Sequence, residues 1–317
     1  MLIFPGQGSQ YKGIGKDLIE ESDRVKDVYY KASSTLGYDI AELSFKDRNN
    51  EINLTRFTQP VLLTHQIACY EYFREISDHD LNPKLLGGHS LGEYTALIIS
   101  GSISFEEGLA LVSKRGELMS KHGSGSMLAM PFERLEAEDL IGQFNCEVAT
   151  INQLQQTVVG GSDQDINSLA ESIAIDFPRK RTVKLKTEGA FHTSLMNQAA
   201  EEFKGFLQGI NFNEMNSPVL SNFSADIHNQ DGSESTDLLY NQLFQPVNWL
   251  GCMETAAKLE IDTIIEFGGG LGEGSLPSEK RPNLEGITKK IFRTLKHDIT
   301  YHPAINTSTI SVSAKTL

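Results

Sequence analysis

The sequence predicts an α/β fold in which a large domain built on a parallel sheet contains a second, smaller inserted domain. Two observations support this prediction. Residues 88–92 have the spacing G-x-S-x-G, which is typical of a sharp turn between a buried strand and a helix. Residues 124–186 show strand and helix patterns in the order β-α-β-β-α-β, which is the ferredoxin-like order. We therefore expect a large α/β-hydrolase-like domain over 1–123 and 187–317, and a small ferredoxin-like domain over 124–186.

The composition is that of a globular protein, and it argues against two classes of partner. The chain has 317 residues, 39% of them hydrophobic, and a formal net charge of -14. This acidic excess argues against nucleic acid or an anionic membrane as a partner. No stretch approaches the ~18 apolar residues of a membrane span, and the first residues lack a signal-peptide pattern. Three widely spaced cysteines predict neither disulfides nor a metal site, so we expect a cytoplasmic protein without a metal.

The first third of the chain alternates between short apolar strands and helical patterns. Leu2–Phe4 is predicted as a strand, and the glycine loop after it, 5–10, lacks the spacing and the lysine of a nucleotide-binding loop. We expect this loop to present backbone N–H groups beside another strand end, as half of an oxyanion hole. The other elements expected before residue 124 are helices over 17–36, 59–76 and 104–120, a strand over 84–87, a helical continuation through 95–99, and an irregular segment over 44–58.

Ser90, at the centre of the G-x-S-x-G turn, is the candidate nucleophile. Glycine is needed two residues before and two residues after it, because side chains there would collide where strand and helix pass each other. The serine also begins a helix, where backbone N–H groups and the helix dipole favour a developing negative charge. The pattern also occurs by chance in unrelated chains, and the apolar flanks are what favour the catalytic interpretation.

Arg115 lies in the helix predicted over 104–120, which a capping box of Ser104 and Glu107 begins. Its neighbours three and four residues away are all apolar: Leu111, Val112, Leu118 and Met119. A guanidinium in that setting is partly buried and needs an anionic partner. The pattern leaves two alternatives open, namely an arginine that extends to solvent and one that pairs with a structural carboxylate.

The inserted segment follows a predicted hinge at 123–126. Its expected elements are a strand over 126–130, a helix over 133–143, strands over 147–151 and 157–160, a helix over 164–175 and a strand over 182–185. It carries a basic run made up of Arg179, Lys180, Arg181, Lys184 and Lys186. These cations either face an anionic partner or form an ordinary solvated surface, and the sequence does not separate the two interpretations.

After residue 186 the chain returns to the large domain. The expected elements are a helix over 194–207, strands over 218–222 and 262–267, a helix that begins after Pro246, a surface loop over 271–284 and a helix over 286–295. The tail beyond residue 298 has no helical period, and we expect it to be poorly ordered.

His192 is the candidate base for Ser90. It is one of eight histidines and follows an apolar residue at the return from the inserted segment. An esterase of the α/β-hydrolase type places an acid after the serine and then a histidine near the C-terminus. Here the best histidine is mid-chain and no acid stands out between the two residues. This pattern weakens the esterase interpretation and favours a Ser–His pair whose imidazole is oriented by a carbonyl group.

Five motifs, in the same order along the chain, resemble the malonyl-CoA:acyl carrier protein transacylase family. They are Phe4–Gln10, Gly88–Tyr94, Arg115–Met119, Phe191-His192 and Gln242–Trp249. The resemblance runs from residue 1 to about residue 295. Residues 57–60 and 189–192 are also similar to the free-standing acyltransferases that serve modular polyketide synthases lacking their own transferase domain.

The resemblance implies a catalytic role for each matching residue. Ser90 is implied to be the nucleophile that takes the acyl group. His192 is implied to be its base, held by a backbone carbonyl in the Gln242 motif. The backbone amides of Gln7 and Leu91 are implied to form the oxyanion hole.

The resemblance also implies substrate-binding roles for Arg115, Phe191, Asn152 and Gln242. Arg115 matches the family arginine that binds the free carboxylate of the malonyl unit as a bidentate pair. Phe191 resembles malonyl-selecting members, and Asn152 matches more loosely a family asparagine of the small domain. The chain departs from the family in two places. Around Asn152 it lacks the usual Asn-Ser-Pro, and an additional loop over 271–284 follows the last predicted strand.

These residues together predict a two-step acyl transfer that uses no metal and no cofactor. Malonyl-CoA is the expected donor, and the phosphopantetheine thiol of an acyl carrier protein is the expected acceptor, in fatty acid or polyketide biosynthesis. We expect a monomer without nucleic acid or membrane partners. The alternatives are an acyl hydrolase that removes acyl groups from carrier proteins, a generic esterase, and a non-catalytic docking protein that keeps the fold.

Overall fold

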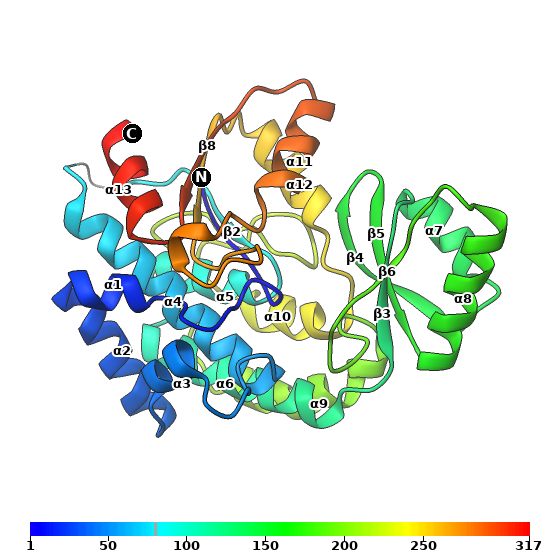
Figure 1. Cartoon of the computed structure of the whole chain (residues 1–317), viewed down its shortest axis with the longest axis horizontal. Coiled ribbons are helices and arrows are strands. Elements are labelled where there is room, and N and C mark those ends of the chain that lie inside the picture. Colours follow the sequence, from blue (N-terminus) through cyan, green and yellow to red (C-terminus); the bar gives the residue numbers. More distant parts are fainter. Residues whose placement is uncertain (79–80) are drawn as a thin grey trace.

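The computed structural model describes residues 1–78 and 81–317, and its larger part is an α/β fold with a parallel sheet, as predicted (Figure 1). In the described residues, the strand order is β2-β1-β7-β8, and all neighbouring strands are parallel. The strands are β1 (Leu2–Phe4), β2 (Leu86–Gly88), β7 (Thr263–Phe267) and β8 (Thr300–Ala304). Because parallel strands need crossover connections, helices cover both faces of this sheet.

Both faces of β1 are buried, which explains why this strand is apolar throughout. Leu2 and Phe4 pack into the larger core. Ile3 belongs to a second core on the other face, with Trp249 and Phe292. Side chains alternate between the faces of a strand, so helices on both sides of β1 favour an apolar residue at every position.

Helices surround the sheet on both sides. Before the second sheet the chain forms α1 (Lys16–Glu21), α2 (Asp23–Leu36), α3 (Ile40–Lys46), α4 (Thr55–Ile76), α5 (Leu91–Ile99) and α6 (Phe105–His122). After it come α9 (Asn197–Leu207), α10 (Ser235–Phe244), α11 (Trp249–Lys258), α12 (Glu285–Thr294) and α13 (Thr307–Thr316), with 3₁₀ turns at Ser194–Met196 and Pro277–Glu279. Among the described residues, every helix is too short or too polar to cross a membrane.

A second, antiparallel sheet lies beside the first (Figure 1). Its strand order is β4-β5-β3-β6, and its elements are β3 (Ser126–Met130), α7 (Arg134–Ile141), β4 (Cys146–Gln153), β5 (Gln156–Gly161), α8 (Asp163–Asp176) and β6 (Val183–Lys184). This part has a core of its own, which includes Phe132, Val159 and Leu169. Figure 1 shows α7 and α8 on the outer side of the sheet, so its other face is turned toward the larger part.

The two connections between these parts run side by side. The N–H of Ala190 donates to the carbonyl of Ser124 at 2.8 Å. A Cβ atom on Gly189 would lie 2.8 Å from the Cα of Gly123, which is closer than real Cβ contacts. Glycine is therefore required where the outgoing and returning segments touch. A further bridge joins Val247 to β4.

Two predictions for the first third of the chain are wrong in detail. The helix predicted over 17–36 is two helices, because Ser22 has an extended backbone (φ -137°) and caps α2 by accepting from the N–H of Val25. The segment 44–58 is not irregular throughout, since α3 ends at Lys46 and α4 already begins at Thr55. Pro60 therefore lies inside α4.

Two predictions after the second sheet also differ from the structure. The strand predicted over 218–222 is reduced to isolated bridges, in which Val219 pairs with Leu86 and Leu220 pairs with Ile227. The helix α10 is not predicted at all, because its polar start in a run of Ser, Thr and Asp residues is typical of a loop.

The tail beyond residue 298 is ordered, which contradicts the prediction. It forms β8 at the edge of the parallel sheet, where Pro303 is tolerated because its outer side needs no donor, and then α13. Asn306 caps α13 with Thr309, and Ile310 is fully buried. The helix is rich in Ser and Thr, which have low helix propensity, so packing rather than propensity stabilises it.

We predict that Ile310→Ala lowers the free energy of unfolding by about 2–5 kcal/mol, because it removes a buried side chain and leaves a cavity. Urea denaturation measures this change. The matched control is Val312→Ala in the same helix, where the side chain is 61% exposed and the expected change is within ~0.5 kcal/mol. Equal stability of the two variants would contradict the packing of α13.

Candidate active site

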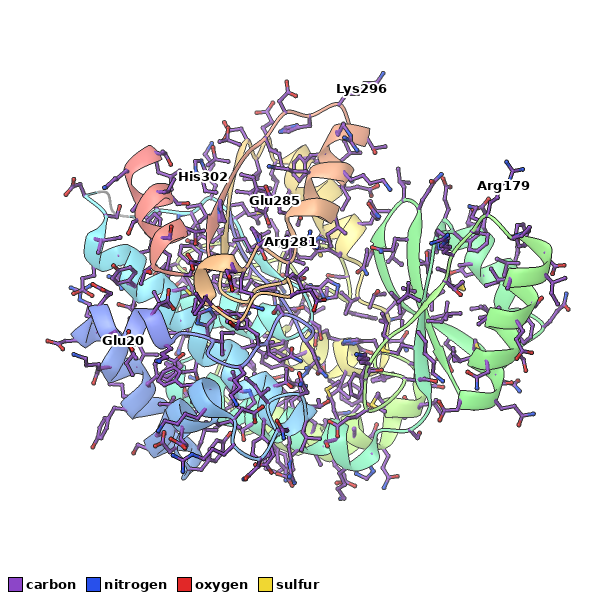
Figure 2. All side chains as sticks on the ribbon, in the orientation of Figure 1. Glu20, Arg179, Arg281, Glu285, Lys296 and His302 are labelled. Carbon is purple, nitrogen blue, oxygen red and sulfur yellow. The ribbon has the colours of Figure 1, made fainter. Side chains whose placement is uncertain are left out.

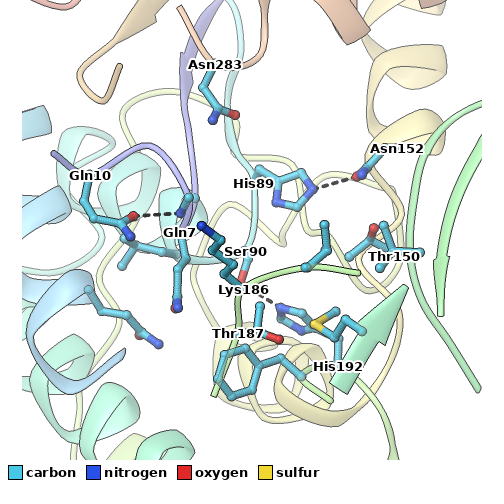
Figure 3. A pocket seen from close by; sticks show the side chains of 18 of the residues that line it. Gln7, Gln10, His89, Ser90, Thr150, Asn152, Lys186, Thr187, His192 and Asn283 are labelled. Atoms are coloured by element: carbon cyan, nitrogen blue, oxygen red, sulfur yellow. Dashed lines mark hydrogen bonds between the residues drawn. The ribbon is translucent and has the colours of Figure 1, made fainter. Parts of the chain in front are cut away.

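A cavity of about 620 Å³ lies where the two sheets approach each other (Figure 3). One wall comes from the loops that follow β1 and β2, at the carboxyl ends of the parallel strands, where α/β sheets generally bind ligands. The opposite wall comes from β4 and β5 of the second sheet. Seven of the eight predicted site residues line this cavity: Gln7, Ser90, Leu91, Arg115, Asn152, Phe191 and His192. The eighth, Gln242, is buried directly behind Arg115 and Ser90.

Ser90 lies in the sharp turn between β2 and α5, with a backbone that L-residues rarely adopt (φ 52°, ψ -102°). A Cβ atom on Gly88 would lie 2.0 Å from the carbonyl carbon of Gly92, and one on Gly92 would lie 2.0 Å from the carbonyl oxygen of Phe4. Both glycines are therefore required for the reason that the sequence suggests. A strained turn of this kind costs on the order of 1–3 kcal/mol.

Asn222 holds this turn in place. Its Oδ1 accepts from the N–H of Ser90 at 2.6 Å, and its Nδ2 donates to the carbonyl of Gly88 at 2.7 Å. Asn222 is fully buried, so these bonds are not weakened by competition with water. It offsets the strain at Ser90, and the sequence carries no signal for this role.

The hydroxyl of Ser90 is hydrogen-bonded to His192 (Figure 3). Its Oγ lies 2.8 Å from Nε2, while Nδ1 lies 2.7 Å from the carbonyl oxygen of Gln242. Because a carbonyl can only accept, Nδ1 carries the proton and Nε2 accepts from the serine. Burial, reinforced by the charge of Arg115, lowers the pKa of His192 to about 3. The imidazole is therefore neutral at physiological pH and able to take a proton.

Arg115 is a fully buried cation with neutral partners. Its Nη1 donates to Oε1 of Gln59 at 2.8 Å, and its Nη2 donates to Oγ of Ser90 and to Oε1 of Gln242, both at 3.0 Å. Its Nε has no hydrogen-bond partner. Among the described residues, Arg115 forms no ion pair with a carboxylate. Both alternatives left open by the sequence are therefore wrong: the side chain neither extends to solvent nor pairs with a structural carboxylate.

Gln7 and Leu91 come from different elements and line the same cavity as Ser90. Leu91 is the first residue of α5, so its N–H has no partner in the preceding helical turn. Gln7 follows β1, and its side chain donates to Oγ1 of Thr55 at 3.2 Å. Both residues line the cavity. Their action as an oxyanion hole stays a prediction.

The turn over residues 88–92, which we call the elbow, contacts the second sheet directly through Asn152. This residue lies on β4, and its Oδ1 accepts from Nε2 of His89 at 2.9 Å (Figure 3). Burial lowers the pKa of His89, which keeps its ring neutral. Phe191 is 5% exposed and lines the cavity next to His192.

The cavity is lined by cations and not by carboxylates. Arg115 and Lys186 line it, whereas no Asp or Glu is among the lining residues of the described chain.

Other members of the basic run over 179–186 lie outside this cavity. Lys184 pairs with Asp163 at 3.2 Å, and Arg179 projects from the outer edge of the smaller part (Figure 2). Within residues 1–78 and 81–317, no three His, Cys, Asp or Glu side chains are grouped so that they could hold a metal ion.

The additional loop over 271–284 leads into one edge of the cavity. It ends at Asn283 and Leu284, which line the cavity. Their backbone N–H groups donate to Glu266 at the end of β7, at 2.7 and 3.1 Å. Burial raises the pKa of Glu266 to about 7. Asn306 fixes the loop from outside by donating to the carbonyl of Pro277 at 2.8 Å.

The sequence does not predict the polar residues beneath the elbow. Glu93 is fully buried and accepts from the N–H of Asn222, from Nε2 of His228 and from Nε2 of Gln242, each at 2.9 Å. The one sequence signal for such a residue is an acid in the first turn of an otherwise apolar helix. His228 lies in a polar stretch of sequence, so the local pattern predicts exposure although the side chain is buried.

Comparison with known proteins adds independent observations. The acyl transferase domain family matches residues 1–267. A malonyl CoA-acyl carrier protein transacylase of Bacillus subtilis is 34% identical over 303 residues, which are 93% of this chain and 90% of the relative. A polyketide biosynthesis malonyl CoA-acyl carrier protein transacylase of Bacillus velezensis is 37% identical over 255 residues, 78% of this chain and 84% of the relative.

Similarity to solved structures extends over the whole chain. A malonyl-transacylase solved in complex with its type II polyketide synthase acyl-carrier protein has a TM-score of 0.85 and 27% sequence identity. The similarity covers 100% of this chain and 99% of that chain.

We predict that Ser90 stays reactive in mild acid, because His192, with a pKa of about 3, remains neutral there. The rate at which a fluorophosphonate labels Ser90, measured by intact mass, is expected to stay level from about pH 8 to about pH 5. A base with the ordinary pKa of ~6.5 would be neutral in only ~3% of molecules at about pH 5. A ~30-fold fall in rate would therefore contradict the lowered pKa. Ser90→Ala is the control that takes no label.

Proposed function

The chain belongs to the malonyl-CoA:acyl carrier protein transacylase family, and on that premise we propose that it transfers a malonyl group from malonyl-CoA to the phosphopantetheine thiol of an acyl carrier protein. The malonyl group is carried on Ser90 between two half-reactions. No metal or cofactor takes part, since the thioester already supplies an activated acyl group.

The observation that carries this proposal is the guanidinium of Arg115 beside the nucleophile. Its Nη2 lies 3.0 Å from Oγ of Ser90, and all of its protein partners are neutral. A malonyl group on Oγ has its free carboxylate one methylene beyond the ester carbonyl, within reach of a side chain that already touches Oγ. This carboxylate supplies the missing anion and can form a bidentate pair with the guanidinium.

In the first half-reaction, Oγ of Ser90 attacks the thioester carbonyl of malonyl-CoA, and its proton passes to Nε2 of His192. The carbonyl of Gln242 accepts from Nδ1–H and stabilises the imidazolium. The amides of Gln7 and Leu91 stabilise the oxyanion of the tetrahedral intermediate. The C–S bond then breaks, His192 returns the proton to the sulfur of coenzyme A, and a malonyl ester remains on the serine.

The second half-reaction reverses these roles. The phosphopantetheine thiol gives its proton to His192 and its sulfur attacks the malonyl ester. The bond between the carbonyl carbon and Oγ of Ser90 breaks, and Oγ takes the proton back from His192. The products are the malonyl-carrier thioester and free Ser90, so the enzyme is regenerated without any other reactant.

The geometry disfavours the hydrolase alternative. A hydrolase needs water to reach the acyl-serine before the thiol does, but His192 is 5% exposed and the cavity wall beside it is formed by buried Phe191. A hydrolase of uncharged acyl groups would also gain nothing from Arg115, whose burial without an anionic partner is costly.

We assign the two walls of the cavity to two domains, the large one over 1–123 and 187–317 and the ferredoxin-like one over 124–186. The proposal is supported by the β-α-β-β-α-β order of the second part, by its antiparallel strand order β4-β5-β3-β6 and by its separate core. A site between two domains can be narrow enough to exclude water from the malonyl-serine.

The acceptor is a carrier protein, and a carrier bound to a solved relative supports this assignment. The curated relatives include one named for polyketide biosynthesis and one that is not, so we assign no pathway.

The monomeric state and the cytoplasmic location that the sequence suggests stay predictions.

We predict that incubation with malonyl-CoA produces a stable malonyl adduct on Ser90, which mass spectrometry of the intact protein and of its peptides detects. Ser90→Ala is expected to take up no malonyl group. The absence of a malonyl adduct on the unchanged protein, together with hydrolysis of an acetyl-carrier protein, would contradict the transferase proposal and support the hydrolase.

We predict that Arg115→Ala lowers kcat/KM for malonyl loading by about 30-fold or more relative to acetyl loading, because losing one side of a buried charge pair costs about 2–5 kcal/mol. The matched control is Lys114→Ala, since Lys114 is the neighbouring cation of α6 and pairs with Glu117 instead. Equal losses for both acyl groups would mean that Arg115 is structural.

A further inference from the structure

We propose that Glu93 is a positioning residue for malonyl recognition, because it fixes the orientation of the Gln242 side-chain amide and thereby the place of Arg115 beside Ser90. The inference rests on the proposed function. Glu93 is fully buried beneath the cavity and does not line it, so it acts through other residues and touches no substrate.

The surroundings of Glu93 make it an acceptor only. Its Oε2 accepts from Nε2 of Gln242 and from the N–H of Asn222, both at 2.9 Å. Its Oε1 accepts from Nε2 of His228, also at 2.9 Å. A carboxylate has acceptor capacity for all three donors and offers no proton in return. Each donor is therefore satisfied, and none of the three can turn away without leaving a buried polar group unpaired.

The amide of Gln242 is consequently held in one orientation. Its Nε2 donates to Glu93 and also to the carbonyl of Ser90, at 2.9 Å in both cases. Both partners are acceptors, so the nitrogen must face them and the oxygen must face the other way. That oxygen accepts from Nη2 of Arg115 at 3.0 Å. A flipped amide would turn an N–H group toward the guanidinium, and two donors would face each other.

Gln242 therefore connects recognition with catalysis. Its side chain holds Arg115, while its backbone carbonyl holds Nδ1 of His192 at 2.7 Å. Of these two contacts of Gln242, only the side-chain contact depends directly on Glu93. The separate bond that Glu93 accepts from the N–H of Asn222 supports the turn at Ser90 for both acyl groups alike. Loss of Glu93 should thus impair the binding of the malonyl carboxylate more than the proton transfer, and this difference separates positioning from general structural support.

His228 provides a way to test hydrogen bonding separately from charge. Its Nε2 faces Glu93 and its Nδ1 lies 3.1 Å from Oγ of Ser235, which can donate or accept. If residue 93 offers an N–H group in place of an oxygen, His228 can change its tautomer, donate from Nδ1 to Ser235 and accept at Nε2. Glu93→Gln can therefore keep every hydrogen bond around Gln242 while it removes the charge.

The test compares kcat/KM for loading from malonyl-CoA and from acetyl-CoA. Glu93→Met has a similar length but no oxygen acceptor, and we expect the malonyl-to-acetyl ratio to fall by about 10-fold or more, the effect of one lost buried hydrogen bond to a charged group. Glu93→Gln should keep the ratio within about 3-fold of the unchanged protein. The matched control is Asp17→Asn, because Asp17 also accepts from a backbone N–H, that of Thr307, but lies outside the cavity lining.

A second variant keeps the proposal testable if Glu93→Met does not fold. Gln242→Met removes the amide but leaves the backbone carbonyl that holds His192, and it should lower the same ratio by a similar factor.

Equal losses of malonyl and acetyl loading in Glu93→Met, or an unchanged ratio in Gln242→Met, would overturn the inference. A ratio as low in Glu93→Gln as in Glu93→Met would also overturn it, because charge rather than orientation would then matter. If the unchanged protein takes up no malonyl group, the proposed function fails and the inference about Glu93 fails with it. If malonyl uptake is normal but the malonyl-to-acetyl ratio does not change in the variants, only the inference about Glu93 is overturned.

Discussion

The strained backbone turn at Ser90 is the constraint on which the rest of the site depends. The turn requires glycine at positions 88 and 92, because helix α5 passes strand β2 at the first position and strand β1 at the second at backbone contact distance. The strain is offset locally by Asn222, which is itself held by Glu93. The layer of buried polar groups beneath the elbow is thus needed to keep an unfavourable conformation in place.

Electrostatics links recognition of the acyl group to the strength of the base. Arg115 is buried among neutral partners, and its charge helps to lower the pKa of His192. A carboxylate bound to the guanidinium would neutralise part of that charge. The pKa of His192 would then rise when a malonyl group is bound, while burial, the larger cause, would still hold it below the ordinary value, and the imidazole would hold the serine proton more readily. Substrates without a carboxylate would not produce this change.

The sequence predicts the elements with strong local signals and misses those that depend on long-range contacts. The elbow and the pairing of Ser90 with His192 follow from glycine spacing and from the position of one histidine. The local pattern predicts a poorly ordered tail in place of the edge strand β8 and helix α13, because burial of residues such as Ile310 is decided by packing and not by local pattern. Glu93 and Asn222 were missed for the same reason, since their partners are more than 120 residues away in sequence.

A crystal structure of the malonylated enzyme would show whether Arg115 binds the free carboxylate of the acyl group on Ser90. We expect both carboxylate oxygens within about 3 Å of guanidinium nitrogens of Arg115, with Nη2 no longer bonded to Oγ of Ser90. A carboxylate that points toward Lys186 or solvent, with Arg115 still bonded to Gln59 and Ser90, would contradict the account.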